Sequence, residues 1–198
     1  MTNDKMKPNQ RLIVAISGAS GAVYGIRALE MLKAAGIESH LVVSKAAALS
    51  LEAETDLSLG DVQALADVVY KPADIGAAIA SGSFRTLGML IAPCSVKTLG
   101  EITTGVTSSL VSRAADVCLK ERRRLVLMVR ESPLHLGHLR SMAAVTEMGA
   151  IVAPPMPAFY TKPKSLDDMV RQSVARSLAL FDIDVPMTRW GEDISLND

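Results

Sequence analysis

Short runs of apolar residues alternate along the chain with longer amphipathic stretches. The apolar runs predict buried strands at 11–17, 39–44, 87–93, 124–129 and 150–154. The amphipathic stretches predict helices at 22–35, 45–54, 95–104, 109–122, 137–148 and 165–181. Strands that are apolar at nearly every position are typical of a parallel sheet covered on both faces. The order of elements therefore predicts an α/β fold, with a doubly wound and mainly parallel sheet.

The ends of the chain differ from this pattern. Residues 1–10 are polar and predict a flexible N-terminal tail, which leaves one domain over residues 11–198. The stretch after Phe181 is mixed and charged, so we expect it to cross a surface or a subunit boundary rather than enter the core. Pro93 is expected to end its strand, because proline cannot donate a hydrogen bond to the ladder.

Composition narrows the class of protein. The chain has 198 residues, a formal net charge of +0 and 4% aromatic residues, which gives no electrostatic or stacking basis for nucleic-acid binding. Its two cysteines, Cys94 and Cys118, do not form a disulfide framework and fit a reducing, cytoplasmic compartment. No apolar run is long enough to suggest a signal peptide or a membrane span.

Ligands of an open α/β sheet bind beyond the carboxyl ends of its strands, so the residues after each apolar run carry most of the chemistry. In this chain these residues are rich in hydroxyls, glycines and cations. They are 17–21, Ser44-Lys45, 94–98, Arg130-Glu131 and 154–157. A set of this kind predicts a site for an anion.

The turn after the first strand contains Gly18, Ser20 and Gly21. Glycines let a ligand approach the backbone, and the N–H groups of the following helix with the Ser20 hydroxyl suit a phosphate. The alternative is a tight turn in which Ser20 only caps the helix. The spacing matches neither the dinucleotide fingerprint nor a Walker loop. No carboxylate follows the second strand, where Ser44-Lys45 stands, and this favours a cofactor with one phosphate, such as FMN, over NAD.

Metal and thiol chemistry are not predicted. His135 and His138 have no third ligand nearby in the sequence, and Asp167-Asp168 is not followed by the further aspartate of magnesium-dependent prenyl-diphosphate enzymes. Cys94 has no histidine or lysine beside it, so a buried, inert thiol is favoured over a nucleophile. The pair Arg130-Glu131 follows a buried strand, where charges are costly unless they are used or paired.

Taken together, these segments resemble the UbiX-type flavin prenyltransferases, including the B subunits associated with phenolic-acid decarboxylases. The resemblance runs from about Arg11 to Trp190. The matching stretches are 17–25, Ser44-Lys45, Glu54-Thr55, 81–83, 93–99, 113–117, 119–121, Arg130-Glu131, His138-Leu139 and 154–160. Each stretch is short, and their order along the chain makes the set specific.

The resemblance implies a Rossmann-like or flavodoxin-like fold and a homododecamer. It implies an enzyme that transfers a dimethylallyl group from dimethylallyl phosphate to N5 and C6 of reduced FMN without a metal ion. The product, prenylated FMN, is the cofactor of UbiD-type decarboxylases, so such a decarboxylase is the expected recipient.

The resemblance also assigns roles to individual residues. FMN contacts are implied for Gly18, Ala19, Ser20, Ser44, Ser95, Val96, Lys97, Thr98 and Arg130. Tyr160 and Arg176, with Lys120, are implied to hold the dimethylallyl phosphate. The implied catalytic residues are Lys120 and the acid/base carboxylates Glu54 and Glu131.

Two alternatives stay open. A non-catalytic FMN carrier for a decarboxylase needs the phosphate-binding turns but not Lys120, Glu131, Tyr160 and Arg176 together. A flavin-dependent cysteine decarboxylase has the same fold but needs an asparagine in the segment that here reads Pro154-Pro155-Met156-Pro157-Ala158.

Overall fold

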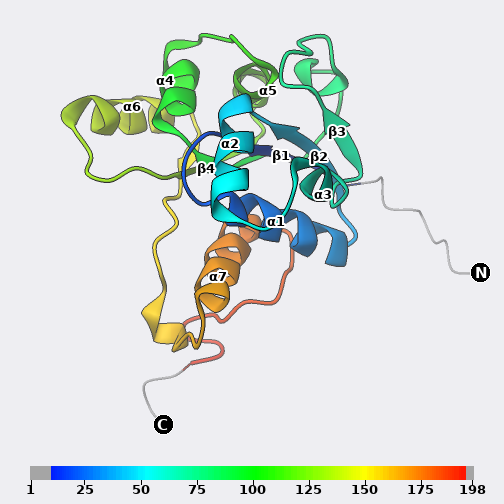
Figure 1. Ribbon diagram of the computed structural model, residues 1–198. Helices are drawn as coiled ribbons and strands as arrows, with labels where there is room; N and C mark the ends of the chain where they lie inside the picture. The colour runs from blue at the N-terminus through cyan, green and yellow to red at the C-terminus, as the bar shows by residue number, and fades with distance from the viewer. Residues whose placement is uncertain (1–9, 195–198) are drawn as a thin grey trace, which may run out of the picture.

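A computed structural model describes residues 10–194, and its centre is one parallel sheet of six strands (Figure 1). The strands are β1 (Arg11–Ile16), β2 (Glu38–Val43), β3 (Val68–Tyr70), β4 (Gly88–Cys94), β5 (Arg124–Val129) and β6 (Ile151–Val152). Their order is β3-β2-β1-β4-β5-β6, and every pairing is parallel. The predicted fold class is confirmed.

The edge strand β3 decides which doubly wound order the sheet has. The five predicted strands stand in the order β2-β1-β4-β5-β6, which is the flavodoxin arrangement when they are counted alone. β3 pairs with β2 at His40↔Val68 and extends the sheet to the Rossmann order. The sequence pattern missed β3 because it has three residues and is only half-buried.

Helices cover both faces of the sheet. They are α1 (Ala22–Ala34), α2 (Lys45–Glu54), α3 (Leu59–Gln63), α4 (Val96–Thr104), α5 (Leu110–Lys120), α6 (Leu136–Glu147) and α7 (Leu166–Ala179), with 3-10 turns η1 (Ala78–Ala80) and η2 (Phe159–Thr161). In Figure 1, α1 and α7 lie on one side of the sheet, and α4, α5 and α6 lie on the other. The short α3 was not predicted, because one turn is too short to show a period.

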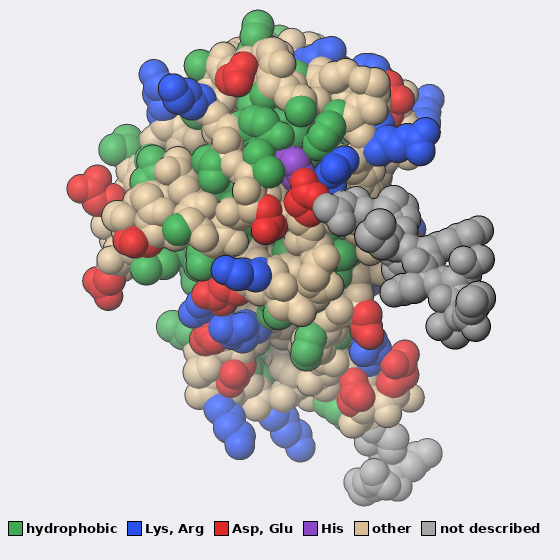
Figure 2. All heavy atoms as spheres, turned by 90° about the vertical axis from the view of Figure 1, so that its right-hand side faces the viewer, with side chains coloured by type: hydrophobic (Ala, Val, Ile, Leu, Met, Phe, Trp, Pro, Cys, Tyr) green, Lys and Arg blue, Asp and Glu red, His purple; other side chains and the backbone are tan. Residues whose placement is uncertain are grey.

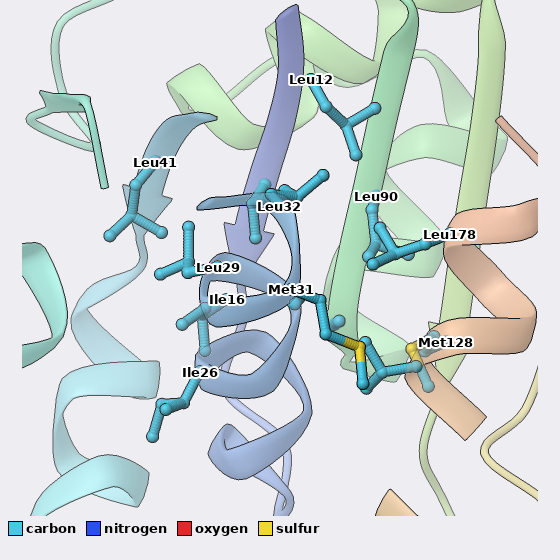
Figure 3. Packing of buried hydrophobic residues seen from close by; sticks show 14 of the residues in the cluster. Leu12, Ile16, Ile26, Leu29, Met31, Leu32, Leu41, Leu90, Met128 and Leu178 are labelled. Atoms are coloured by element: carbon cyan, nitrogen blue, oxygen red, sulfur yellow. The ribbon is translucent and has the colours of Figure 1, made fainter. Parts of the chain in front are cut away.

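Each central strand contributes alternate residues to two cores. Leu12 and Leu90 point toward Leu32 of α1 and Leu178 of α7 (Figure 3). The alternate residues of the same strands, such as Ile13 of β1, pack with α4 and α5 on the opposite face. Burial on both faces explains why the strands are apolar throughout rather than at every second position.

Two expectations about the chain ends and Pro93 need correction. β4 continues through Pro93 to Cys94, because a register shift against β5 between Ile91 and Cys94 interrupts the ladder where proline lacks its N–H. After α7 the chain follows the surface but places Ile183 and Val185 in the core, at 5% and 3% exposed, while Asp182 and Asp184 stay exposed. The predicted tail over residues 1–10 lies outside the described residues except for Gln10, whose carbonyl accepts a hydrogen bond from Glu38 N.

Charge is distributed without a dominant sign on the face seen in Figure 2, where Lys and Arg side chains are interspersed with Asp and Glu. This agrees with the balanced count of charged residues. Among residues 10–194, no helix has the length and apolar character needed to span a membrane.

Gly25 of α1 lets this helix lie directly on the sheet, and it provides a test of the packing. A Cβ at Gly25 would lie 2.5 Å from Ile16 Cγ1 and 2.6 Å from the Ala92 carbonyl oxygen. We expect Gly25→Ala to destabilise the fold by about 1–3 kcal/mol through overpacking. The matched control is Gly100→Ala in α4, where a Cβ meets nothing within 4 Å and the better helix propensity of alanine is expected to add up to ~1 kcal/mol. Urea unfolding measures both changes, and equal effects of the two substitutions would contradict this account.

Candidate functional site

Hydrogen bonds from Ser17 join the carboxyl ends of β1 and β4. Ser17 N and Oγ donate to the Pro93 carbonyl at 3.2 and 2.8 Å, and Ser17 Oγ accepts from Ser95 N at 2.8 Å. The strand order reverses between β1 and β4, which is where open α/β sheets bind ligands. The first residues of α1, α2 and α4 follow from β1, β2 and β4 at this edge.

One cavity at this edge, of about 450 Å³, is rich in hydroxyl groups, and we call it the hydroxyl cavity. Its lining residues are Gly18, Ser44, Lys45, Ala46, Pro72, Ala73, Ser95, Lys97, Thr98, Glu101, Ser108, Ser109 and Val111. It thus contains five of the nine predicted FMN contacts: Gly18, Ser44, Ser95, Lys97 and Thr98.

Two helices begin at the hydroxyl cavity. Ser44 Oγ accepts a hydrogen bond from Ala47 N and caps α2, and Ser95 Oγ accepts from Thr98 N and caps α4. Helix N-termini carry partial positive charge and outward-facing N–H groups, so two of them at one cavity favour an anion. This cavity has the donor set that a phosphate monoester requires.

A second cavity of about 400 Å³, the Glu54 cavity, is lined by Ser20, Gly21, Val23, Tyr24, Glu54, Thr55, Arg130 and Pro155. Glu54 Oε2 accepts hydrogen bonds from Gly21 N at 2.7 Å and Ala22 N at 3.1 Å. The N-terminus of α1 therefore already has a carboxylate on it. Gly21 N and Ala22 N are thus bonded to a carboxylate, whereas serine hydroxyls cap α2 and α4. The phosphate contact expected at the turn before α1 stays a prediction.

Hydrogen bonds, with a smaller contribution from Arg130, set the charge state of Glu54 in this cavity. Desolvation raises the pKa of Glu54, but hydrogen bonds from Gly21, Ser20 and Ala22 and the Arg130 charge outweigh it, so the pKa lies below its ordinary value. Burial raises the pKa of Tyr24, and Arg130 opposes this rise. At neutral pH the cavity thus holds an ionised carboxylate, a guanidinium and a neutral phenol.

A third cavity, of about 290 Å³, lies between β6 and α7 and includes Tyr160 and Arg176. These two predicted phosphate contacts are therefore brought together by the fold. The Tyr160 ring packs edge-on against Trp190, with centroids 5.5 Å apart. A phenol hydroxyl and a guanidinium in one cavity suit a second phosphate group.

The remaining predicted site residues lie apart from these groups. Lys120 ends α5 at the opposite edge of the sheet, where its ammonium pairs with Glu121. Glu131 is exposed after β5, and its Oε1 accepts a hydrogen bond from Ser132 N. Ala19 follows Gly18 in the turn after β1, and Val96 is the first residue of α4; neither lines any of the three cavities described above.

Sequence reasoning did not single out Glu101 or Ser108, which line the hydroxyl cavity. Glu101 stands four residues after Lys97 and binds its ammonium at 2.6 Å, and Ser108 Oγ donates to the same carboxylate oxygen at 2.6 Å. The i,i+4 spacing was a readable signal for the ion pair. The approach of Ser108 depends on the tertiary fold.

Both thiols are buried, which confirms the expectation for Cys94. Desolvation raises the pKa of Cys94 to about 12, and the pKa of Cys118 also rises to about 12 by burial, opposed by the charge of Arg123. Thiols of this kind are inert. Over residues 10–194, no group of three His, Cys, Asp or Glu side chains is arranged to hold a metal ion.

Comparison with known proteins places the chain among flavoproteins. A family model described as Flavoprotein matches residues 1–177. The flavin prenyltransferase UbiX of Escherichia coli K12 is 58% identical over 185 residues, covering 91% of this chain and 98% of that protein.

Two crystal structures are similar over nearly their whole length. AnUbiX (PadA1), in complex with FMN and dimethylallyl pyrophosphate, has a TM-score of 0.92 and 49% identity, covering 93% of this chain and 98% of that one. A dodecameric FMN-dependent UbiX-like decarboxylase from Escherichia coli O157:H7 has a TM-score of 0.88 and 50% identity, covering 91% and 98%.

The carboxylate at the start of α1 makes a testable contribution to stability. Because the pKa of Glu54 is lowered in the fold, its contribution is fully present above its ordinary pKa of 4.5 and is lost as the pH falls through the lowered value. An exposed charge at a helix N-terminus is typically worth ~0.3–1 kcal/mol, so we expect Glu54→Gln to lower the melting temperature by about 1–4 °C at pH 7. The difference from the parent protein should narrow in acid.

The control for this experiment is Glu52→Gln, which removes an exposed carboxylate from the same helix and is expected to change little. Thermal unfolding between pH 7 and pH 3 measures all three proteins. If Glu54→Gln lowers the melting temperature by the same amount at every pH, the charge on Glu54 is not what stabilises the turn.

Proposed function

This chain belongs to the UbiX family of flavin prenyltransferases, and we propose that it joins a dimethylallyl group from dimethylallyl phosphate to N5 and C6 of reduced FMN. The observation that carries the proposal is the arrangement of groups at the carboxyl ends of the strands, which we call the ligand edge. A cavity built for one phosphate, the hydroxyl cavity, occurs together with the charged Glu54 cavity and with the cavity of Tyr160 and Arg176.

The hydroxyl cavity fits the phosphate of FMN. Ser44, Ser95 and Thr98 supply hydroxyl groups at the N-termini of α2 and α4, and Lys97 adds a positive charge. Charge-assisted hydrogen bonds to a phosphate are worth about 1.5–3 kcal/mol each. The absence of a carboxylate after β2 also favours a flavin mononucleotide over a dinucleotide that needs its ribose hydroxyl held there.

Arg130 and Glu54 border the place that we assign to the flavin ring. When bound, reduced FMN supplies the electron-rich positions that accept the prenyl group. Arg130 provides fixed positive charge, and ionised Glu54 is hydrogen-bonded to the turn at Gly21 and Ala22. Glu131, on the residue after Arg130, is proposed to accept the proton that C6 must lose, either directly or with the released phosphate.

Tyr160 and Arg176 are proposed to hold the phosphate of the prenyl donor. Negative charge develops on this leaving group, and fixed donors placed there lower the barrier without a metal ion. Lys120 stands at the opposite edge of its own chain, so we propose that it reaches this phosphate from a second copy of the protein. The dodecameric assembly of the similar structure from Escherichia coli O157:H7 supports such a contribution.

The product of this reaction is prenylated FMN, and the proposed recipient is a UbiD-type decarboxylase. We also propose a homododecamer and a cytoplasmic location, since two free, buried thiols favour a reducing compartment. A carrier of unmodified FMN would need the hydroxyl cavity but would have no use for Tyr160 and Arg176 in a cavity of their own.

The proposal predicts a product that can be weighed. We expect anaerobic incubation with reduced FMN, dimethylallyl phosphate and EDTA to release a flavin heavier by one prenyl unit, as measured by mass spectrometry. A parallel incubation with the diphosphate identifies the preferred donor. Recovery of ordinary FMN alone would overturn the prenyltransferase proposal in favour of the carrier, and activity restored only by magnesium would show that a metal neutralises the leaving group.

Substitution of Arg176 tests whether the donor phosphate and the flavin are bound by different residues. We expect Arg176→Ala to leave FMN affinity unchanged and to lower the prenylation rate by roughly 30- to 1,000-fold, because one transition-state donor is worth ~2–4 kcal/mol. Arg171→Ala is the matched control on the same helix, since Arg171 pairs with Asp167 and Glu30 outside the cavity of Tyr160 and Arg176. Equal decreases in the prenylation rate of both variants would indicate a general effect on the packing of α7 instead.

A further inference from the structure

We propose that Glu101 weakens the hold of the hydroxyl cavity on the flavin phosphate, so that the prenylated product can leave after each turnover. This inference rests on the proposed function, in which FMN is consumed as a substrate and its product must depart. Glu101 is then a residue that sets flavin exchange rather than one that binds the flavin.

The first observation is a carboxylate in a cavity otherwise suited to an anion. Glu101 lines the hydroxyl cavity together with Ser95 and Thr98, and its side chain is only 14% exposed. It lies three residues beyond Thr98 on α4, which places it about 4.5 Å further along the helix axis. Negative charge at this distance repels a bound phosphate.

The second observation is that Glu101 already holds the cation of the cavity. Lys97 Nζ binds Glu101 Oε1 at 2.6 Å, although the lysine side chain is 76% exposed and free to turn elsewhere. A phosphate entering the hydroxyl cavity must share Lys97 with this carboxylate. The ion pair thus lowers the gain that Lys97 offers to the flavin.

The opposing explanation is that Glu101 only fastens the loop between α4 and α5. Ser108 Oγ donates to Glu101 Oε1, and Leu110 N donates to the Pro72 carbonyl at 2.9 Å, so this loop forms a wall of the cavity. The two explanations predict opposite signs. Loosening the wall weakens flavin binding, whereas removing the competing charge strengthens it.

The test is Glu101→Gln, whose amide oxygen can still accept the hydrogen bond from Ser108. Because repulsion between partly screened charges a few ångströms apart is worth about tenfold in a binding constant, we expect oxidised FMN to bind roughly 3- to 30-fold more tightly and to dissociate more slowly. Riboflavin, which has no phosphate, should bind as it does to the parent protein. Fluorescence quenching of the flavins measures both affinities.

Two control variants separate charge from structure. Ser108→Ala removes the fastening of the loop but keeps the carboxylate, so it should not tighten FMN. Glu147→Gln removes a carboxylate at the end of α6 and should have no effect. Unchanged or weaker FMN binding by Glu101→Gln, or tightening that riboflavin shares, would overturn the proposal.

These affinities are measured without a prenyl donor, so a failure of prenylation in the earlier assay leaves their result intact. With donor present, we expect Glu101→Gln to slow steady-state turnover relative to its own first turnover, as product release becomes limiting. A steady-state rate equal to that of the parent, despite tighter binding, would overturn the role in product release.

Discussion

The ligand edge depends on the hydrogen bonds by which buried Ser17 joins β1 to β4. Ser17 is 1% exposed, donates to the Pro93 carbonyl and accepts from Ser95 N, so one side chain fixes two strand ends. These strands flank the point where the strand order reverses. The position of Ser95, and with it the start of α4, follows from this contact. A buried hydroxyl that lost a partner here would carry the cost of an unsatisfied polar group, typically ~1–3 kcal/mol, and would also displace the hydroxyl cavity.

Three helices begin at this edge, and their N-termini are capped by different groups. A carboxylate from Glu54 covers the start of α1, while short serine side chains cap α2 and α4. A serine cap satisfies one N–H group without adding charge, so the helix end still attracts an anion. Glu54 adds a full negative charge and removes that attraction. In the proposed function, this difference separates the site of the flavin phosphate from the site of the ring and the reacting carbons.

The sequence predicted the central strands and long helices because their burial imposes a period on the residues. It missed β3, which is short and half-exposed, and it ended β4 early at Pro93, since the register shift that accommodates proline is a property of two paired strands. Position after strands or family resemblance predicts Ser44, Ser95, Thr98, Tyr160 and Arg176 as site residues, and the fold places each of them in the lining of a cavity. The contact between Glu54 and the turn at Gly21 joins residues 33 positions apart, and no local pattern reveals such a pairing. Lys120 is a case in which resemblance assigns a role that a single chain does not explain. Its own chain places it at the edge of the sheet opposite to Tyr160 and Arg176.

A flavin that is consumed as a substrate must be bound and then released, whereas a resident cofactor only has to be bound. A resident cofactor gains from every added contact, whereas a substrate that must leave as a larger product gains only from contacts that the transition state uses. The ligand edge agrees with the second case. Its hydroxyl cavity offers helix ends and hydroxyl groups, yet its lysine is shared with Glu101. The cavity of Tyr160 and Arg176 has a guanidinium and no carboxylate among its lining residues, whereas Arg130 shares its cavity with ionised Glu54. An unbalanced guanidinium thus lines the cavity where charge is proposed to develop on the leaving group, and a balanced pair lines the cavity where the phosphate of the flavin is proposed to be held and released.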